Sequence, residues 1–218
     1  NRLRNKEDRR RIVADSDNGI PGWQCIAHSI GWENVIVSST PLEEYRGKSV
    51  TQIALETAGE PTETALDVLL ESGGEATTIN FGMSEGIIEQ ILQSPSSSIC
   101  TDALFTGGIP HPRNYGAFPR VIGKYVRDQK TINLPQAISK MTMVPCQRLG
   151  LKDRGVIAKG MAADIVVFDL DTVGENGTFE NPEQYPSGIK WVIVNGKVVV
   201  EDHKHTGMTP GNVIRKPK

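Results

Sequence analysis

The sequence predicts an α/β protein, because short runs with the composition of buried strands alternate with segments that have the apolar spacing of helices. Residues 97–101 form a strand-like run that ends at Asp102, and residues 116–125 have the spacing of a helix. A strand, a loop and a helix in this order are typical of one βα unit of a barrel. Short apolar runs after residue 151 predict a separate region of β-structure.

The first part of the chain is expected to be mainly helical, with one strand. Apolar residues fall at helical spacing in two of its segments, and the paired glycines Gly73 and Gly74 are a signal for the end of the second. The expected elements are a charged helix at 1–11, a turn at 19–23, a strand within 32–39, and helices at 49–58 and 62–71.

The middle of the chain predicts alternating strands and helices. Ser84 is a typical first residue of a helix that ends near Gln93, and Asn133 with Gln136 predicts a reciprocal cap for a later helix. Pro119 is expected in the first turn of its helix, where its missing N–H costs least. The expected elements are strands at 76–81 and 97–101, and helices at 84–93, 116–125 and 134–141.

The last part of the chain predicts antiparallel strands. Asn195-Gly196 separates two apolar runs by two residues, which is a strong signal for a tight hairpin turn. The expected strands are 156–157, 165–168, 191–194 and 197–200. This region carries no residues that predict chemistry of its own, and His203 and His205 are expected to be exposed.

Composition and charge exclude several classes of partner. The 24 basic and 26 acidic side chains give a net charge of −2, which indicates neither nucleic acid nor an anionic membrane as a partner. No apolar run approaches the length of a membrane span. The three cysteines are widely spaced and odd in number, which favours a reducing compartment, so we expect a cytoplasmic protein.

The loop between residues 100 and 125 is the best candidate for a functional site. It brings one carboxylate, one histidine and two arginines together among prolines and glycines, namely Asp102, His111, Arg113 and Arg120. A carboxylate at the end of a strand either faces a substrate crevice or caps the following turn. From the residues alone Arg113 is a solvated residue held by Pro112, and His111 is expected to shape the loop rather than to bind metal.

Short motifs with a fixed order run from this loop to the end of the chain, and they resemble the N-acyl-D-amino-acid deacylases, or D-aminoacylases, of the metal-dependent amidohydrolase superfamily. The resemblance is weakest in residues 1–45. The motifs are Asp102, His111-Pro112-Arg113, Tyr115-Gly116-x-Phe118-Pro119-Arg120-Val121, Tyr125-x-Arg127, Lys140-Met141-Thr142, Arg148-Leu149-Gly150-Leu151, Asp153-Arg154-Gly155, Ala163-Asp164-Ile165-Val166-Val167-Phe168-Asp169, Thr178-Phe179, Val194-Asn195-Gly196 and Thr206-Gly207-x-x-Pro210-Gly211.

The resemblance implies roles for the three loop residues in hydrolysis of an N-acyl-D-amino acid, the small-molecule substrate. It implies that Asp102 is the general base beside a zinc centre, and a possible ligand of that metal. It implies that Arg113 binds the α-carboxylate of the substrate, with His111 nearby. The other zinc ligands of the family precede the part of the enzyme that this chain matches, so the expected cofactor is zinc in the complete enzyme.

The resemblance also implies a fold larger than this chain. A barrel of this type needs about 250 residues, so we expect the 218 residues to be the C-terminal part of a (β/α)8 metal-dependent hydrolase barrel with an active-site insertion, plus half of a small β-sandwich domain. The expected partner is the N-terminal part of the same enzyme, without which the chain should be inactive. The expected regions are the insertion at 1–75, the last barrel elements at 76–150, and sandwich strands at 151–218.

Two alternatives to a deacylase stay open from the sequence. Cyclic-amide hydrolases of the dihydroorotase or hydantoinase type share the segment Gly160-x-x-Ala163-Asp164-x-Val166-Val167. Arg113 separates these classes, because the resemblance ties a carboxylate-binding arginine at this position to the deacylases. The second alternative is a noncatalytic scaffold module, since the chain lacks the metal ligands of the family.

Overall fold

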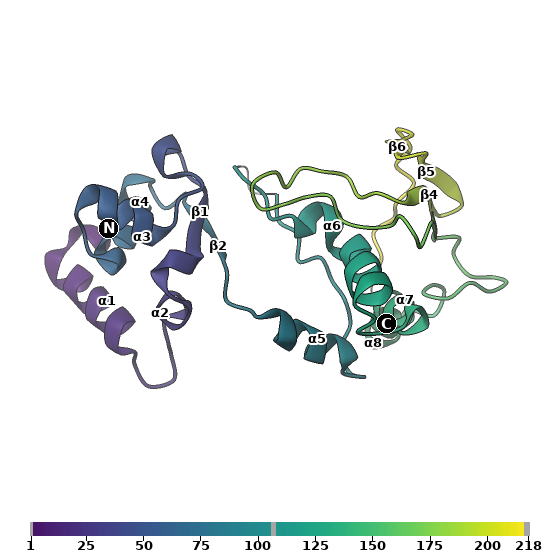
Figure 1. Ribbon diagram of the computed structural model, residues 1–218, viewed down its shortest axis with the longest axis horizontal. Coiled ribbons are helices and arrows are strands. Elements are labelled where there is room, and N and C mark those ends of the chain that lie inside the picture. The colour runs from purple at the N-terminus through teal and green to yellow at the C-terminus, as the bar shows by residue number, and fades with distance from the viewer. Residues whose placement is uncertain (1, 106–107, 216–218) are drawn as a thin grey trace. The chain divides into compact units, whose positions relative to one another are not determined.

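A computed structural model describes residues 2–105 and 108–215, which form two compact units (Figure 1). Unit 1 comprises Asn1–Met83 and Phe105–Pro110, and unit 2 comprises Ser84–Leu104 and His111–Lys218. The expected division into an insertion, barrel elements and sandwich strands stays a prediction. No helix in the described part of the chain combines the length and apolarity needed to cross a membrane.

Unit 1 is mainly helical, as expected, but its first helix is longer than the sequence predicts. The Asn5 side chain accepts hydrogen bonds from the backbone N–H groups of Glu7 and Asp8, so the helix begins at Lys6 and continues to Asn18. The elements are η1 (Arg2–Arg4), α1 (Lys6–Asn18), α2 (Ile26–Ile30), η2 (Trp32–Asn34), β1 (Val35–Ser39), η3 (Glu43–Tyr45), α3 (Val50–Thr57), α4 (Pro61–Glu71) and β2 (Thr77–Asn80).

The core of unit 1 lies between its sheet and two of its helices. β1 and β2 pair antiparallel, and Val37 of β1 packs with Ile53 of α3 and Val68 of α4. The helix predicted at 49–58 is confirmed, with Ser49 and Gln52 forming a reciprocal cap. The short helix α2 was not predicted, because five residues are too few for an apolar period to stand out.

Unit 2 combines a helical cluster with an antiparallel sheet. The reciprocal cap of Asn133 and Gln136 is confirmed, as is the cap of Ser84 at the start of α5. Helix α8 was not predicted. The elements are α5 (Glu85–Gln93), α6 (Arg113–Arg120), η4 (Val121–Asp128, a π-helix), α7 (Leu134–Met141), α8 (Met143–Leu149), β3 (Ile165–Phe168), β4 (Ile189–Val194), β5 (Lys197–Glu201) and β6 (Lys204–His205).

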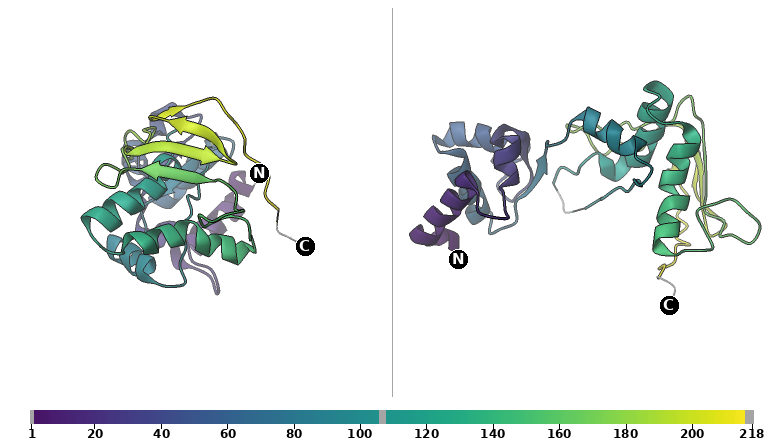
Figure 2. Two further views of the ribbon diagram at one scale, coloured as in Figure 1. Left: turned by 90° about the vertical axis from the view of Figure 1, so that its right-hand side faces the viewer. Right: turned by 90° about the horizontal axis from the view of Figure 1, so that it is seen from below.

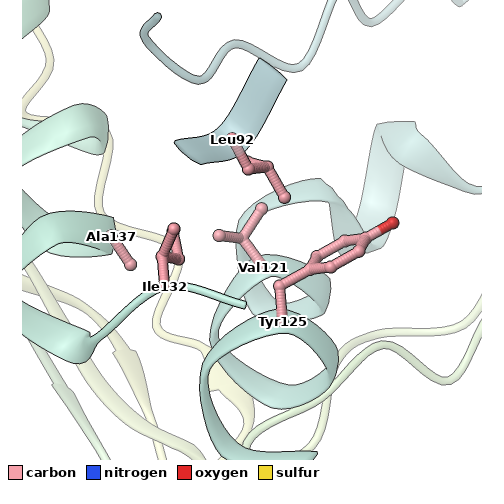
Figure 3. Close-up of a cluster of buried hydrophobic side chains, with 5 residues drawn as sticks. All are labelled: Leu92, Val121, Tyr125, Ile132 and Ala137. Carbon is pink, nitrogen blue, oxygen red and sulfur yellow. The ribbon is translucent and has the colours of Figure 1, made fainter. Parts of the chain in front are cut away.

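Five buried side chains form the hydrophobic core of the helical part of unit 2 (Figure 3). They come from α5, η4, α7 and the turn between η4 and α7, so one cluster joins three helices. Ile99, in the segment before Asp102, packs against the same cluster. The core residues are Leu92, Val121, Tyr125, Ile132 and Ala137.

The helix predicted at 116–125 begins three residues earlier and changes its hydrogen-bond pattern along its length. Pro119 lies inside α6, not in its first turn, so that part of the prediction was wrong. Proline cannot donate a backbone hydrogen bond and its ring crowds the preceding turn, which disturbs the α-helical pattern. After Arg120 the chain continues as the π-helix η4, a local widening of the kind often found at functional sites.

The second sheet has the order β3-β4-β5-β6, with every neighbouring pair antiparallel (Figure 2). Asn195 and Gly196 have φ angles of 46° and 75°, so both lie in the left-handed region that a two-residue hairpin turn requires, and the predicted hairpin is confirmed. Val156 and Ile157 belong to no strand, and the prediction there was wrong. These two residues pair with no strand in the described chain, and Ile157 is 87% exposed, so they do not have the burial that their apolar character suggested.

The strand predicted at 97–101 is also absent from the described residues, and that prediction was wrong. The segment pairs with no other strand, and the backbone N–H of Ile99 donates instead to the carbonyl of Lys140 in α7. A strand exists only with a partner for its backbone groups. The apolar residues that suggested a strand are explained by Ile99, which packs into the helical core.

Candidate active site

Asp102 lies in an irregular loop with an unusual backbone conformation. Its φ angle is 47°, in the left-handed region that non-glycine residues seldom occupy and that aspartate tolerates better than most. The side chain is 73% exposed. The left-handed turn therefore sends this carboxylate outward from a segment that Ile99 anchors to the core, so the residue is presented to its surroundings rather than used in packing.

Arg113 meets Asp102 at the start of α6. Its Nη2 lies 2.9 Å from Oδ2 of Asp102, and the arginine side chain is 37% exposed. An ion pair this accessible contributes only about 0–1 kcal/mol to stability. The buried Nε of Arg113 finds no hydrogen-bond partner within residues 2–105 and 108–215. The guanidinium thus has an unused donor beside the one that faces Asp102.

His111 completes the group of three predicted residues. Its Nδ1 accepts a hydrogen bond of 3.0 Å from the backbone N–H of Arg113, and its ring meets Phe179 edge to face with centroids 5.1 Å apart. Burial, with a smaller effect from the Arg113 charge, lowers the pKa of His111 below its ordinary value. A neutral ring that accepts at Nδ1 carries its proton on Nε2, so His111 fixes the first amide of α6.

Two contacts around this group were missed from the sequence. The Nδ2 of Asn114 donates to the carbonyl of Leu104 over 2.7 Å, which ties the Asp102 loop to α6. The two residues are ten positions apart, so no local pattern of side-chain to backbone bonding predicts this link. Phe179 lies 68 residues beyond His111 in the chain, and no sequence spacing predicts that contact.

A charged network supports the helix that carries Arg113. Glu85 of α5 accepts from Arg120 at 2.9 Å, from Lys124 at 2.8 Å and from the hydroxyl of Tyr125 at 2.7 Å. Arg120 also pairs with Glu175. The bonds from Lys124 and Tyr125 hold the pKa of Glu85 below its usual range, while burial raises the pKa of Tyr125. α5 and η4 are therefore joined by charge as well as by the core.

A metal centre is not formed by the described residues. Among residues 2–105 and 108–215, no three histidine, cysteine, aspartate or glutamate side chains lie close enough together to hold a metal ion. The donor set at the candidate site is one carboxylate, Asp102, with a half-buried imidazole whose Nδ1 is already bonded. His203 and His205 are both exposed, as expected.

A hollow of about 530 Å³ lies in unit 1, between the end of α1 and α2. Asp17, Trp23 and His28 line it, and Asp17 already accepts hydrogen bonds from Thr62 and pairs with His28 at 3.0 Å. None of the three predicted site residues lines this hollow.

Comparison with known proteins agrees with the resemblance in the sequence. A profile of the Amidohydrolase family matches residues 90–200, just over half of the chain. An N-acyl-D-glutamate deacylase from Alcaligenes xylosoxydans xylosoxydans is 38% identical over 181 residues, which cover 83% of this chain and 36% of that protein. A D-aminoacylase from the same organism is 36% identical over 182 residues, 84% of this chain and 37% of that protein.

Solved structures of deacylases also resemble this chain. The crystal structure of an N-acyl-D-glutamate deacylase from Bordetella bronchiseptica, complexed with zinc and a phosphonate inhibitor, superimposes with a TM-score of 0.73 at 34% identity. The match covers 80% of this chain and 36% of that one. A dihydroorotase from Lactobacillus acidophilus is 32% identical over only 96 residues, 39% of this chain and 22% of that protein.

The chain spans a little over a third of the length of the deacylases that it matches. The profile match, the identity over four fifths of this chain and the structural likeness all point to one group of proteins. The chain therefore belongs to the amidohydrolase family, among the D-aminoacylases.

Proposed function

We propose that this chain supplies part of the active site of an enzyme that hydrolyses N-acyl-D-amino acids to a carboxylate and a D-amino acid. The observation that carries the proposal is the pair of Asp102 and Arg113, whose charged groups are 2.9 Å apart in an accessible loop. A base and a cation this close can act on two neighbouring parts of one small substrate, its amide and its carboxylate.

Arg113 is proposed to bind the α-carboxylate of the substrate. The Nε–H and Nη2–H groups of a guanidinium point in one direction and match the two oxygens of a carboxylate. Nε has no protein partner in the described chain, and Nη2 has only the exposed Asp102. A substrate carboxylate that displaces Asp102 from Nη2 would also reach the buried Nε beside it, so binding would release Asp102 for chemistry.

Asp102 is proposed to be the general base. Once Arg113 holds the substrate carboxylate, the freed carboxylate of Asp102 can take a proton from the attacking water and return it to the amine that leaves. A carboxylate does this best when it is positioned within hydrogen-bond reach of the water. The exposure of the Asp102 side chain, at 73%, supports access by both water and substrate.

Zinc, named for the related deacylase, does not fit the described residues on their own, because they contain no cluster of three metal-binding side chains. We propose that the enzyme carries zinc on ligands outside the residues described, with Asp102 as a possible additional ligand. His111 serves the site by ordering the start of α6 and forming one wall beside the substrate.

The architecture of the whole enzyme is also a proposal. Residues 76–150 are proposed as the last elements of a (β/α)8 barrel and residues 1–75 as an insertion that covers its active site. The antiparallel sheet β3-β4-β5-β6 supports half of a small β-sandwich at 151–218. The N-terminal part of the same enzyme is the proposed partner, and the cytoplasm the proposed location.

A cyclic-amide hydrolase is the second candidate, supported by the match to dihydroorotases. That match covers 39% of the chain against 83% for the N-acyl-D-glutamate deacylase. The free Nε of Arg113 favours a substrate with a carboxylate beside the amide, which linear N-acyl-D-amino acids have.

Reconstitution tests the proposal. The purified chain at micromolar concentration should neither hold stoichiometric zinc nor hydrolyse N-acetyl-D-methionine. Mixing it with a polypeptide equivalent to the N-terminal two thirds of a D-aminoacylase should restore both. Zinc content by elemental analysis and release of D-methionine are the two measurements. If the mixture folds and binds zinc but leaves every N-acyl-D-amino acid intact, the chain is a noncatalytic module and the proposed function is wrong.

A further inference from the structure

Lys140 is the only charged residue among the buried residues of the described chain. Only 7% of it is exposed, although it lies on helix α7. Its ammonium donates to three oxygens of one short turn: the carbonyls of Ser94 and Ser97, and the hydroxyl of Ser97 at 2.8 Å. No carboxylate pairs with Lys140 in the described part of the chain.

Burying an ammonium group costs free energy unless hydrogen-bond acceptors replace its water. The three oxygens around Lys140 take the place of that water. Ser94 is the C-cap residue that follows α5, and the last carbonyls of a helix carry partial negative charge. The lysine therefore satisfies the end of α5 and at the same time fixes the shape of the turn that follows. Arg148 of α8 adds a bond of 2.6 Å to the carbonyl of Ser96 in this turn.

The same lysine also holds the segment that leads to Asp102. Its backbone carbonyl accepts a hydrogen bond of 3.1 Å from the N–H of Ile99, whose side chain packs against the helical core. Lys140 therefore holds residues 94–99 at two points. Its side-chain ammonium binds Ser94 and Ser97, and its backbone carbonyl binds Ile99. Asp102 follows three residues later in its left-handed conformation, and no strand within residues 2–105 and 108–215 pairs with this segment.

We propose that Lys140 is a positioning residue, which holds the turn at 94–97 and the segment after it so that Asp102 faces Arg113. The inference rests on the proposed function of Asp102 for its catalytic consequence, but not for its structural one. Lys140 acts through Asp102 and touches neither substrate nor metal.

The structural consequence is tested on this chain by amide hydrogen exchange. Lys140→Met keeps the length and packing of the side chain but removes its donors, and it should speed exchange at residues 97–102, with the amide of Ile99 as the main reporter. Lys152→Met, at an exposed lysine of the same unit, is the matched control and should leave these amides unchanged. Unchanged protection of residues 97–102 in Lys140→Met overturns the proposal.

A milder variant, Ser97→Ala, tests the proposal if Lys140→Met does not fold. Ser97→Ala removes only the hydroxyl that Lys140 binds, and it should speed exchange at the same amides by a smaller factor. If Lys140→Met does not fold and Ser97→Ala exchanges like the wild type, the proposal is wrong.

The catalytic consequence is tested in the reconstituted enzyme. Lys140→Met should lower kcat by about 10- to 100-fold, the scale for a catalytic group displaced by about 1 Å, with little change in KM. The double variant Lys140→Met/Asp102→Asn should be no slower than Asp102→Asn alone, because both changes disable the same group. Independent losses that multiply would overturn a role through Asp102. An inactive wild-type mixture would reject the proposed function and leave the exchange result to decide the role of Lys140.

Discussion

The helical core of unit 2 and the Asp102–Arg113 site lie in the same unit but are held in different ways. The core packs five side chains that are at most 7% exposed, from α5 to α7. At the site, the two charged side chains are 37% and 73% exposed and their pairing adds little stability. The core therefore fixes the fold, while the site is free to exchange a protein contact for a substrate contact.

Tyr125 lies at the boundary between these two kinds of region. Its ring is 2% exposed and belongs to the core, and its hydroxyl donates to Glu85 in the charged network beside α6. Core and network together hold the helix whose first residue is Arg113. The buried, packed part of this unit therefore ends where the candidate chemistry begins, and variants on either side should separate stability from activity.

The largest effect is expected from a cavity in the core. Leu92→Ala should lower the free energy of unfolding by about 2–5 kcal/mol, because the side chain is 5% exposed and belongs to the cluster that joins three helices. Ile91→Ala, on the 48% exposed face of the same helix, is the matched control and should change it by about 1 kcal/mol or less. Urea denaturation of the purified chain measures both. Equal losses would show that this cluster is not the core of the unit.

A change at Arg113 should lower activity and leave stability almost unchanged, the opposite of a change in the core. Arg113→Lys keeps the charge but loses the paired donors. In the reconstituted enzyme kcat/KM on N-acyl-D-amino acids should therefore fall roughly 30-fold, which corresponds to a loss of about 2 kcal/mol of transition-state stabilisation. The free energy of unfolding should change by less than about 1 kcal/mol.

The control substrate for Arg113 is an otherwise identical N-acyl amine without the carboxylate. The wild-type enzyme should be poor on it, and Arg113→Lys should be no worse. Equal losses on both substrates would make Arg113 a structural residue and contradict its role in binding the carboxylate.

The smallest effect is expected from titration of His111, whose ring is partly exposed. Its pKa is lowered in the folded chain, chiefly by burial, so the unfolded chain takes up the proton first as the pH falls. The free energy of unfolding should be highest above about pH 6.5, the ordinary histidine pKa, and fall below it. Urea denaturation at pH 7.5 and 5.5 should show a smaller decline in His111→Gln than in the wild type. An identical decline would mean that His111 is not the group responsible.

Much of the helical framework follows from the sequence. The caps at Ser84 and Asn133 are local, because each side chain bonds a backbone group three residues along the chain, and such patterns can be predicted directly from the sequence. The hairpin at Asn195-Gly196 is equally local, since both residues adopt the positive φ angles that their types favour. These elements were predicted correctly for that reason.

The errors arose where distant residues decide the structure. The run at 97–101 resembles a strand, but Ile99 bonds to Lys140 and packs in the helical core. The role of Lys140 depends on a turn 43–46 residues away, and the contact of His111 with Phe179 spans 68 residues. The sequence did identify Asp102, His111 and Arg113 as one group, because they share one loop. Their pairing depends on the left-handed turn at Asp102, which no local pattern predicts.

The kinetics of Asp102→Asn in the reconstituted enzyme test the central claim most directly. Asparagine keeps the shape of the side chain but cannot accept the proton, so kcat should fall by roughly 100-fold or more while KM changes little. Zinc content is measured alongside, because a loss of metal would show that Asp102 is also a ligand. A variant that retains its zinc and shows a near-normal kcat would contradict the assignment of Asp102 as the general base.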